Sequence, residues 1–434
     1  MALRVAVIGA GPAGLCAARY LSAEPDRYVP TVYEQTAAVG GTFVYTDRTG
    51  TDEHGLPLRS NMYKNLRTNV PKEAMTFPDF PHDSSLPSFL PHGEVLRYLE
   101  NYADHFGLHN HIKFLNRVDV VKPVHVHGTM KWHVTTSKVT DKESPTTEQL
   151  IQSWRYSVPF TPAIPGTDQF QGRTLHSHDY RVPEPYTGKN VVIMGASTSG
   201  IDLCVELSKV AERVVISHSN PPIMKINKLP PNVTQAPRVE SIVGPNTVRF
   251  QDGQEFLADD IVYCTGYSLS FPFLTPECGI TINEGRAYPL YKHITNTTYP
   301  TMSFAGLTHH ALTFALFQLQ IKFALGVLDG SISLPSKAAM DHEIDQDFKS
   351  RLEAGLAPRK AHSIYPLYMS YVTDLAKVTR QPFPQGQTEM FMDAFARRFS
   401  DPQHFRNAEY KITGPETWER VPHQSKEQQL STAE

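Results

Sequence analysis

Two glycine-rich turns are the residues of this chain whose spacing predicts binding chemistry. The first occupies residues 9–14, reads G-A-G-P-A-G and follows the apolar run at residues 4–8. Its first glycine permits a tight turn, its second lets the backbone approach a pyrophosphate, and its third lets the next helix pack on the strand. The N-terminus of that helix offers free N–H groups and the positive end of its dipole to phosphate oxygens. The pattern predicts a dinucleotide site.

The residues that follow support this prediction. The run 31–33 reads as a second strand and ends in Glu34, twenty residues after Gly14. An acid at this spacing can accept hydrogen bonds from a ribose hydroxyl. An ordinary glycine turn between strand and helix explains the glycines but not the acid. The residues expected at this site are Gly9, Gly11, Pro12, Ala13, Gly14, Glu34 and Gln35.

The second turn, at residues 195–200, reads G-A-S-T-S-G and follows the apolar run 189–194. Ser197 replaces the middle glycine, and its side chain fits if it points away from the pyrophosphate. The next expected strand ends in Ser217 and His218 and not in an acid. A carboxylate there repels a 2′-phosphate, whereas hydroxyl and imidazole donors tolerate one. A phosphorylated dinucleotide is therefore favoured at the second site.

Composition excludes several other functions. At 434 residues the chain is long enough for two or three domains, and its net charge of -3 gives no reason to expect a nucleic acid or an anionic membrane as partner. Four cysteines lie far apart, and the histidines lack a third and a fourth ligand, so neither a disulfide framework nor a metal site is predicted. The apolar run 311–328 carries Gln318, Gln320 and Lys322, which predicts a core helix and not a membrane span.

Four motifs in order resemble a known family. They are the first glycine turn followed by G-G-T-F at residues 40–43, L-R-T-N-V-P-K-E-A-M at 66–75, F-x-G-x-x-x-H-x-x-x-Y at 170–180, and D-I-V-Y-C-T-G-Y at 260–267. Together they resemble the flavin-containing monooxygenases, in particular a soluble branch similar to plant glucosinolate S-oxygenases. The resemblance extends to about residue 326.

This resemblance implies an α/β fold with two dinucleotide-binding, Rossmann-like domains, the smaller inserted in the larger. We expect residues 1–160 and 267–434 to form the FAD-binding domain, with a polar C-terminal tail, and residues 161–266 to form the NADPH-binding domain. FAD then belongs to the first glycine turn and NADPH to the second.

The resemblance also implies the reaction. NADPH reduces FAD, the reduced flavin and dioxygen form a C4a-hydroperoxide, and a small-molecule thioether sulfur or amine nitrogen takes the distal oxygen. Asn69 aligns with the family's asparagine at the flavin edge and is the expected catalytic residue, and Gln320 matches the family's late flavin-contacting glutamine. The other expected cofactor contacts are Gly41, Thr42, Phe43, Gly195, Ser197, Ser199, Gly200, Ser217, His218, Thr265 and Gly266.

One segment departs from the family pattern. Family members carry an apolar strand ending in C-x-G-H before the stretch that corresponds to residues 156–166, whereas residues 146–155 read T-T-E-Q-L-I-Q-S-W-R. This run has no glycine and is too polar for a central parallel strand, which predicts that the strand is missing. The alternative to an active oxygenase is therefore a catalytically impaired or inactive relative that binds dinucleotides.

Two other enzyme classes share parts of this plan. Disulfide reductases need a redox cysteine pair that the sequence lacks. Baeyer-Villiger monooxygenases usually carry tryptophan where Tyr180 and Arg181 stand here. The apolar stretch near the N-terminus is the glycine turn itself and does not predict a signal peptide. We expect a cytoplasmic protein without a membrane anchor, and the sequence leaves a homodimer open.

Overall fold

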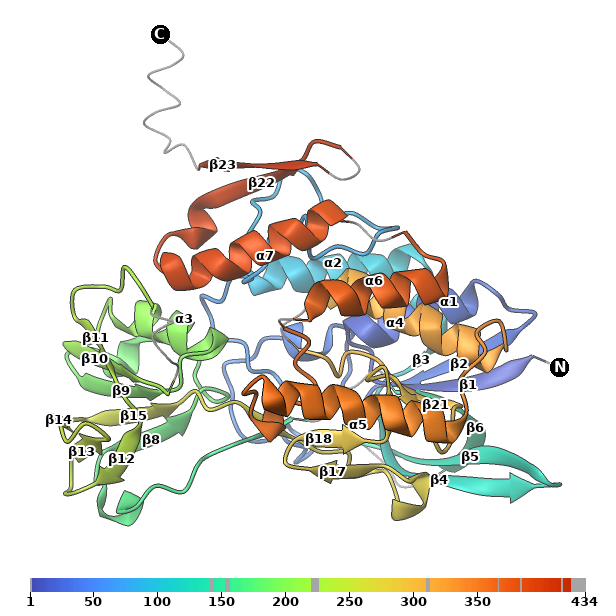
Figure 1. Cartoon of the computed structure of the whole chain (residues 1–434), viewed down its shortest axis with the longest axis horizontal. Coiled ribbons are helices and arrows are strands. Elements are labelled where there is room, and N and C mark those ends of the chain that lie inside the picture. The colour runs from blue at the N-terminus through green and yellow to red at the C-terminus, as the bar shows by residue number, and fades with distance from the viewer. Residues whose placement is uncertain are drawn as a thin grey trace, which may run out of the picture.

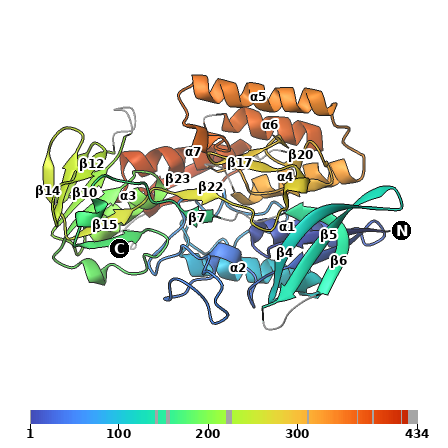
Figure 2. The same cartoon turned by 90° about the horizontal axis from the view of Figure 1, so that it is seen from below.

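The computed structural model describes residues 2–139, 144–152, 157–219, 226–309, 313–365, 367–382, 385–414 and 417–422; residues 144–152 are described by their backbone path. Its helices and strands gather around two sheets of different size. Both views place the smaller sheet, which includes β10 and β15, at one end of the molecule and the larger sheet at the other (Figure 1, Figure 2). The mixed α/β architecture predicted from the sequence is confirmed.

The larger sheet has nine strands. They are β1 (Leu3–Ile8), β2 (Tyr28–Tyr33), β3 (Ile112–Lys113), β4 (Asn116–Val126), β5 (Thr129–Lys138), β6 (Ser144–Gln152), β19 (Leu290–Tyr291), β20 (Thr295–Asn296) and β21 (Met302–Phe304). The central order is β21-β6-β1-β2-β3, and these neighbours run parallel. Strands β4 and β5 form an antiparallel extension on β6. Residues 3–152 and residues 290–304, which are distant in the sequence, therefore contribute strands to one sheet.

Strand β6 corrects the prediction that residues 146–155 leave a gap in this sheet. Its backbone pairs with β1 over residues 149–152 and with β21 over residues 150–152, and a hairpin from β5 brings the chain to this position. The two neighbouring strands offer backbone partners on both sides, and this tertiary environment outweighs the polar composition that argued against a strand. The expectation of a missing strand is therefore wrong. The alternative hypothesis of an inactive relative depended on that missing strand and is no longer supported by it.

Three helices cover one face of the larger sheet: α1 (Pro12–Ser22), α2 (His92–His105) and α4 (Thr313–Leu328). Because side chains alternate along a strand, Val5 and Val7 of β1 pack under these helices, whereas Ala6 and Ile8 join a second cluster on the opposite face. Helix α4 confirms the predicted core helix. In the part of the chain that the structure describes, no helix has the length and apolar character needed to cross a membrane.

The smaller sheet has five parallel strands in the order β11-β10-β9-β15-β8. They are β8 (Arg173–His176), β9 (Asn190–Met194), β10 (Arg213–Ser217), β11 (Val233–Ala236) and β15 (Asp260–Tyr263), and α3 (Thr198–Leu207) follows β9. A three-stranded antiparallel sheet of β12 (Val239–Ile242), β13 (Thr247–Phe250) and β14 (Glu255–Leu257) packs beside it. The predicted second strand-turn-helix unit is thus present.

The remaining elements connect and cover these sheets. They are β7 (Ser157–Pro159), β16 (Tyr267–Leu269), β17 (Thr281–Asn283), β18 (Arg286–Tyr288), α5 (Lys337–Glu353), α6 (Tyr368–Thr379), α7 (Gln385–Ser400), the short helix η8 (Phe405–Asn407), β22 (Ala408–Ile412) and β23 (Trp418–Pro422). Strands β22 and β23 pair as a hairpin, and Tyr410 packs edge-on against Phe89. The segment expected as a polar tail therefore contains η8 and the strands β22 and β23. In Figure 1, α7 lies above α2 and extends toward α3.

Candidate functional site

The first glycine turn folds into a narrow backbone cradle. Gly9 has a φ of +97°, and its N–H donates to the Tyr33 carbonyl at 2.8 Å. Gly11 precedes α1, whose first residue, Pro12, has no N–H that the helix would leave unpaired. A Cβ on Gly41 would lie 3.0 Å from the Gly11 Cα, and Gly41 itself has a φ of +57°. Backbone therefore lines both sides of this turn, and a side chain on either glycine would narrow it.

Glu34 is buried beside this turn. One carboxylate oxygen accepts the N–H of Ala10 at 2.8 Å, and the other accepts the N–H and the hydroxyl of Thr36 at 2.8 and 2.9 Å. Burial raises the pKa of Glu34, while these hydrogen bonds oppose the rise. The carboxylate thus holds the end of β2 against the turn after β1. Each oxygen has two lone pairs, so the group can still accept a ribose hydroxyl.

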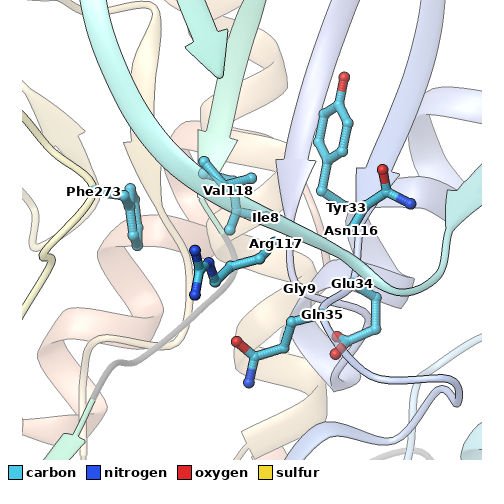
Figure 3. Close-up of a pocket in the computed structure, with 9 residues that line it drawn as sticks. All are labelled: Ile8, Gly9, Tyr33, Glu34, Gln35, Asn116, Arg117, Val118 and Phe273. Carbon is cyan, nitrogen blue, oxygen red and sulfur yellow. The ribbon is translucent and has the colours of Figure 1, made fainter. Parts of the chain in front are cut away.

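A small cavity, open in part to solvent, adjoins Glu34. Figure 3 shows Glu34, Gln35 and Arg117 around it, with Phe273 on the far side. Its lining includes Asn116, Arg117 and Val118 of β4, which follow β3 in the chain. Polar donors beside an apolar ring suit a flat heterocycle such as a nucleoside base. Sequence reasoning did not assign β4 or Phe273 to this site, because their approach to Glu34 depends on tertiary contacts.

The second glycine turn has the same construction. Gly195 has a φ of +110°, and a Cβ on it would lie 2.5 Å from the Cys264 carbonyl oxygen. A Cβ on Gly200 would lie 1.8 Å from the Gly195 carbonyl oxygen, so only glycine lets α3 pack this closely. Ser197 is the exposed residue before α3, and Ser199 lies in the first turn of the helix. The serine in place of the middle glycine is thus accommodated by exposure.

Ser217 is the last residue of β10 and His218 follows it, as predicted, but the two side chains differ in burial. The Ser217 hydroxyl is buried, donates to the Pro237 carbonyl at 2.7 Å and accepts the Val239 N–H at 3.0 Å. The hydroxyl proton of Ser217 is therefore used in a hydrogen bond within the protein. His218 is half-buried beside Gln235.

Sequence reasoning missed a cation near the end of the same strand. The exposed Arg238 guanidinium donates to the Ser219 hydroxyl at 2.9 Å. It arrives from the loop after β11, which the Ser217 hydroxyl fastens to the end of β10. A guanidinium is a strong donor to phosphate, so Arg238 is a candidate phosphate-binding group beside His218.

Asn69 lies between the two dinucleotide units in a hydrogen-bonded group of four side chains. Its Oδ1 accepts a hydrogen bond from the Nη2 group of Arg406. The same nitrogen donates to both carboxylate oxygens of Asp202 at 2.8 and 2.7 Å, and the Tyr63 hydroxyl donates to Asp202 at 2.8 Å. Asp202 belongs to α3, while Arg406 belongs to η8. No sequence motif indicated these partners.

Gln320 is fully buried, and its amide is used within the protein. Its oxygen accepts the Gly306 N–H at 2.9 Å, and its NH₂ group donates to the hydroxyls of Thr308 and Tyr371, each at 3.1 Å. The expected flavin-contacting residue therefore holds the 306–308 backbone in place. Its neighbour on α4, Gln318, has a buried Oε1 without a hydrogen-bond partner among the described residues.

The remaining predicted residues lie at two places: Thr265 and Gly266 between β15 and β16, and Thr42 and Phe43 in a short helix at residues 41–43. Thr265 donates its hydroxyl to the Phe160 carbonyl, and the Gly266 carbonyl accepts the His176 imidazole at 3.0 Å. Burial lowers the pKa of His176, which favours its neutral form. Phe43 is half-buried and packs edge-on against Phe314, while Thr42 is exposed.

The comparisons with known proteins agree with this geometry. The sequence model of a family described as FMO-like, flavin-binding monooxygenase-like, matches residues 2–228 and 227–423. The chain belongs to this family. Flavin-containing monooxygenase FMO GS-OX-like 4 of Arabidopsis thaliana is 34% identical over 426 residues, which cover 93% of each protein. Senecionine N-oxygenase of Tyria jacobaeae is 32% identical over 419 residues, which cover 95% of this chain and 90% of that protein.

A solved structure gives the same result. S-allyl-L-cysteine S-oxygenase from Allium sativum superposes with a TM-score of 0.86 at 30% identity, covering 94% of this chain and 96% of that one. As a member of the flavin-binding monooxygenase-like family, the chain is a flavin-dependent monooxygenase, and its membership implies FAD and NADPH as cofactors.

The described residues fit these two dinucleotides. The Gly11–Gly41 cradle leaves space that a Cβ would fill, and Gln318 offers a buried acceptor oxygen that has no hydrogen-bond partner among the described residues. Among the described residues, no group of three or more histidine, cysteine, aspartate or glutamate side chains is placed to hold a metal ion. Such a monooxygenase needs no metal, because the organic cofactor carries the redox chemistry.

Proposed function

We propose that this protein uses NADPH, FAD and dioxygen to oxygenate the thioether sulfur or amine nitrogen of a small molecule. The observation that carries the proposal is the pair of glycine cradles, at Gly11–Gly41 and at Gly195–Gly200, each at the N-terminus of a helix that follows a parallel strand. Relatives named as S- and N-oxygenases support the choice of sulfur and nitrogen substrates. A cytoplasmic location and a homodimer stay predictions from the sequence.

For FAD, we assign the pyrophosphate to the backbone of residues 9–14 and the ribose to Glu34. The adenine then belongs in the cavity beside Gln35 and Arg117, where the β4 backbone and Phe273 supply the walls. Gly41, Thr42 and Phe43 border the cradle on its other side. When bound, the flavin supplies the electron transfer and the activation of dioxygen.

For NADPH, we assign the pyrophosphate to the backbone of residues 195–200, including Ser197 and Ser199. His218 and Arg238 are placed to receive the 2′-phosphate, while Ser217 supports them by holding the loop that carries Arg238. Thr265 and Gly266 shape the passage between the units. These residues orient the coenzyme and do not take part in proton transfer.

For the oxygen transfer, we assign to Asn69 a hydrogen bond from its NH₂ group toward the reacting edge of the flavin. A fixed donor stabilises negative charge that develops on oxygen, and it does so most strongly where water is excluded.

We also propose that residues 1–160 and 267–434 form the FAD-binding domain and residues 161–266 the NADPH-binding domain. The complete larger sheet supports full flavin binding by this chain.

The test is the flavin content of the purified protein, followed by NADPH oxidation with a simple thioether and with a tertiary amine. We expect about one FAD per chain and formation of sulfoxide or N-oxide in step with NADPH consumption. Hydrogen peroxide, measured in parallel, separates oxygenation from a bare oxidase reaction. A protein that binds flavin but releases only hydrogen peroxide with a broad panel of both substrate classes would falsify the proposal.

A further inference from the structure

Arg406 joins three segments that are distant in the sequence. Its Nη2 group meets Asn69 and Asp202, which precede it by 337 and 204 residues. Its Nε also donates to the Thr68 carbonyl at 2.9 Å. The Asp202 side chain is 5% exposed and that of Arg406 17% exposed, so the ion pair is shielded from solvent. Hydrogen bonds between charged groups in such surroundings are short and strong.

The chemistry of arginine determines how the Asn69 amide lies. A guanidinium has only donors, whereas an amide has an accepting oxygen at one end and a donating NH₂ at the other. Arg406 therefore requires the amide oxygen to face it, and the NH₂ group must point away. Without this partner the two amide orientations are nearly equal in shape, and only the hydrogen-bond network distinguishes them.

Asp202 fixes the guanidinium in turn. Both of its oxygens accept hydrogen bonds from Arg406, and one also accepts the Tyr63 hydroxyl. Tyr63 therefore fixes the carboxylate that fixes the guanidinium. Asp202 lies one helical turn after Thr198, the first residue of α3, in the helix that follows the second glycine turn. The orientation of the Asn69 amide is thereby linked to the helix that begins at the coenzyme site.

We propose that Arg406 is the positioning residue for Asn69, with Asp202 as its anchor on the coenzyme-binding unit. Arg406 turns the amide so that its NH₂ group donates toward the flavin edge. Asp202, which belongs to α3, fixes the position of Arg406 relative to that helix. This inference rests on the proposed function, because it assigns the donor role of Asn69 to one orientation of its amide. Arg406 itself acts through Asn69.

The experiment compares Arg406→Met, Asp202→Asn, Asn69→Ala and the double variant Arg406→Met/Asn69→Ala as flavin-loaded proteins. Arg406→Met retains the length of the side chain and removes its donors. We expect it to raise the ratio of hydrogen peroxide to oxygenated product about tenfold, because a misplaced donor loses much of its effect. Asp202→Asn should raise the ratio in the same direction by a smaller factor.

The double variant tests whether Arg406 acts through Asn69. If it does, the ratio of hydrogen peroxide to oxygenated product in the double variant should lie within about twofold of the ratio in Asn69→Ala alone, because the effects of interacting sites are not additive. Multiplied effects would mean that Arg406 acts independently, and the inference would be overturned. The control is Arg420→Met, which removes an arginine that pairs with Asp393 in the same C-terminal region at 2.7 Å and should leave the ratio unchanged.

A second readout does not depend on activity. The visible circular dichroism of bound flavin responds to groups around its ring, so Arg406→Met and Asn69→Ala should change the spectrum alike, at equal flavin content. An unchanged spectrum in Arg406→Met beside a changed one in Asn69→Ala overturns the inference even if the unmodified chain oxygenates no substrate. Absence of oxygenation by the unmodified chain instead overturns the proposed function, so the two failures are distinct.

Discussion

The carboxylate of Glu34 accepts the backbone N–H of Ala10 at 2.8 Å and so fastens the end of β2 to the glycine turn after β1. This bond gives the acid a structural task in addition to the ribose contact assigned to it. A substitution at Glu34 therefore acts on the turn as well as on the cofactor.

We predict that Glu34→Ala raises the dissociation constant of FAD at least about tenfold, equivalent to about 1.4 kcal/mol. The loss combines the ribose contact with an unpaired Ala10 N–H, which costs about 1–3 kcal/mol when buried. Fluorescence of flavin released on dilution measures the effect. Glu53→Ala is the matched control, because Glu53 is an exposed carboxylate that pairs with Arg48 and His54 of its own loop. Equal flavin retention by both variants would remove Glu34 from the site.

We predict that Gly11→Ala separates flavin binding from folding. Gly11 has an ordinary φ of -76°, and a Cβ on it would lie 3.7 Å from the Gly41 Cα, an ordinary contact. The protein therefore tolerates the methyl group, while the space for a pyrophosphate is reduced. The flavin-free variant should unfold within about 2 °C of the flavin-free parent, a difference under about 1 kcal/mol, yet retain little FAD.

The comparison variant for this prediction is Gly41→Ala. It places a Cβ 3.0 Å from the Gly11 Cα at a φ of +57°, so it should lower both the melting temperature and the flavin content. Normal flavin content in Gly11→Ala would show that the cradle is wider than the structure indicates.

We predict that NADPH is preferred to NADH at least about tenfold in apparent affinity, about 1.4 kcal/mol, and that Arg238→Gln and His218→Glu reduce this preference. Arg238→Gln removes a positive charge beside the expected 2′-phosphate, and His218→Glu replaces a donor with a carboxylate that repels it. Ser217→Ala should lower stability by about 1–3 kcal/mol, because it leaves the Val239 N–H without a partner, and should reduce the preference less than Arg238→Gln does, because it only loosens the loop that carries Arg238. Equal use of both coenzymes by the unmodified protein would contradict the assignment.

We predict that acid destabilises this protein in part through His293. Burial, followed by the charge of Arg351, lowers the pKa of His293 to about 3 from 6.5. Its ring contacts His362 at 3.1 Å and Arg351 at 3.5 Å, and Asp347 lies 3.9 Å away. The unfolded chain binds the proton below pH 6.5 while the folded chain does not, so the stability that the neutral ring contributes is lost as pH falls from 6.5 toward 3.

From pH 7.5 to pH 5.5 this single group should lower the free energy of unfolding by about 1.4 kcal/mol. Urea unfolding of the unmodified protein and of His293→Gln at both pH values measures the difference, since other buried histidines such as His82 contribute equally to both proteins. Parallel pH profiles for the two proteins would exclude His293 as a source of acid sensitivity.

Local spacing explains which parts of the fold and site were predictable. Gly9, Gly11 and Glu34 lie within one strand-turn-helix-strand unit, where backbone geometry dictates residue type, and the structure brings them together as expected. Ser217 was placed correctly at the end of its strand, but the partner of its hydroxyl depends on a loop some twenty residues later. Position follows from local pattern, whereas the direction of a hydrogen bond depends on tertiary contacts.

Distant partners were not predictable for the same reason. Arg406 meets Asn69 across 337 residues, and no periodicity or motif marks either side of that contact. The prediction for β6 was wrong for a related reason. Its polar residues argued against a strand, but the backbones of β1 and β21 pair with it on both sides. Composition describes how a segment behaves alone and not what its neighbours require of it.

The position of β6 between β1 and β21 has a consequence for the order of folding during synthesis. Strands β1 and β2 leave the ribosome early, but the sheet they belong to lacks β21 until residue 304 has been made. The smaller sheet, contained in residues 173–263, is complete before then. Distant pairings form slowly and leave strand edges exposed meanwhile. The nascent chain should therefore depend on chaperones most between the emergence of β2 and that of β21.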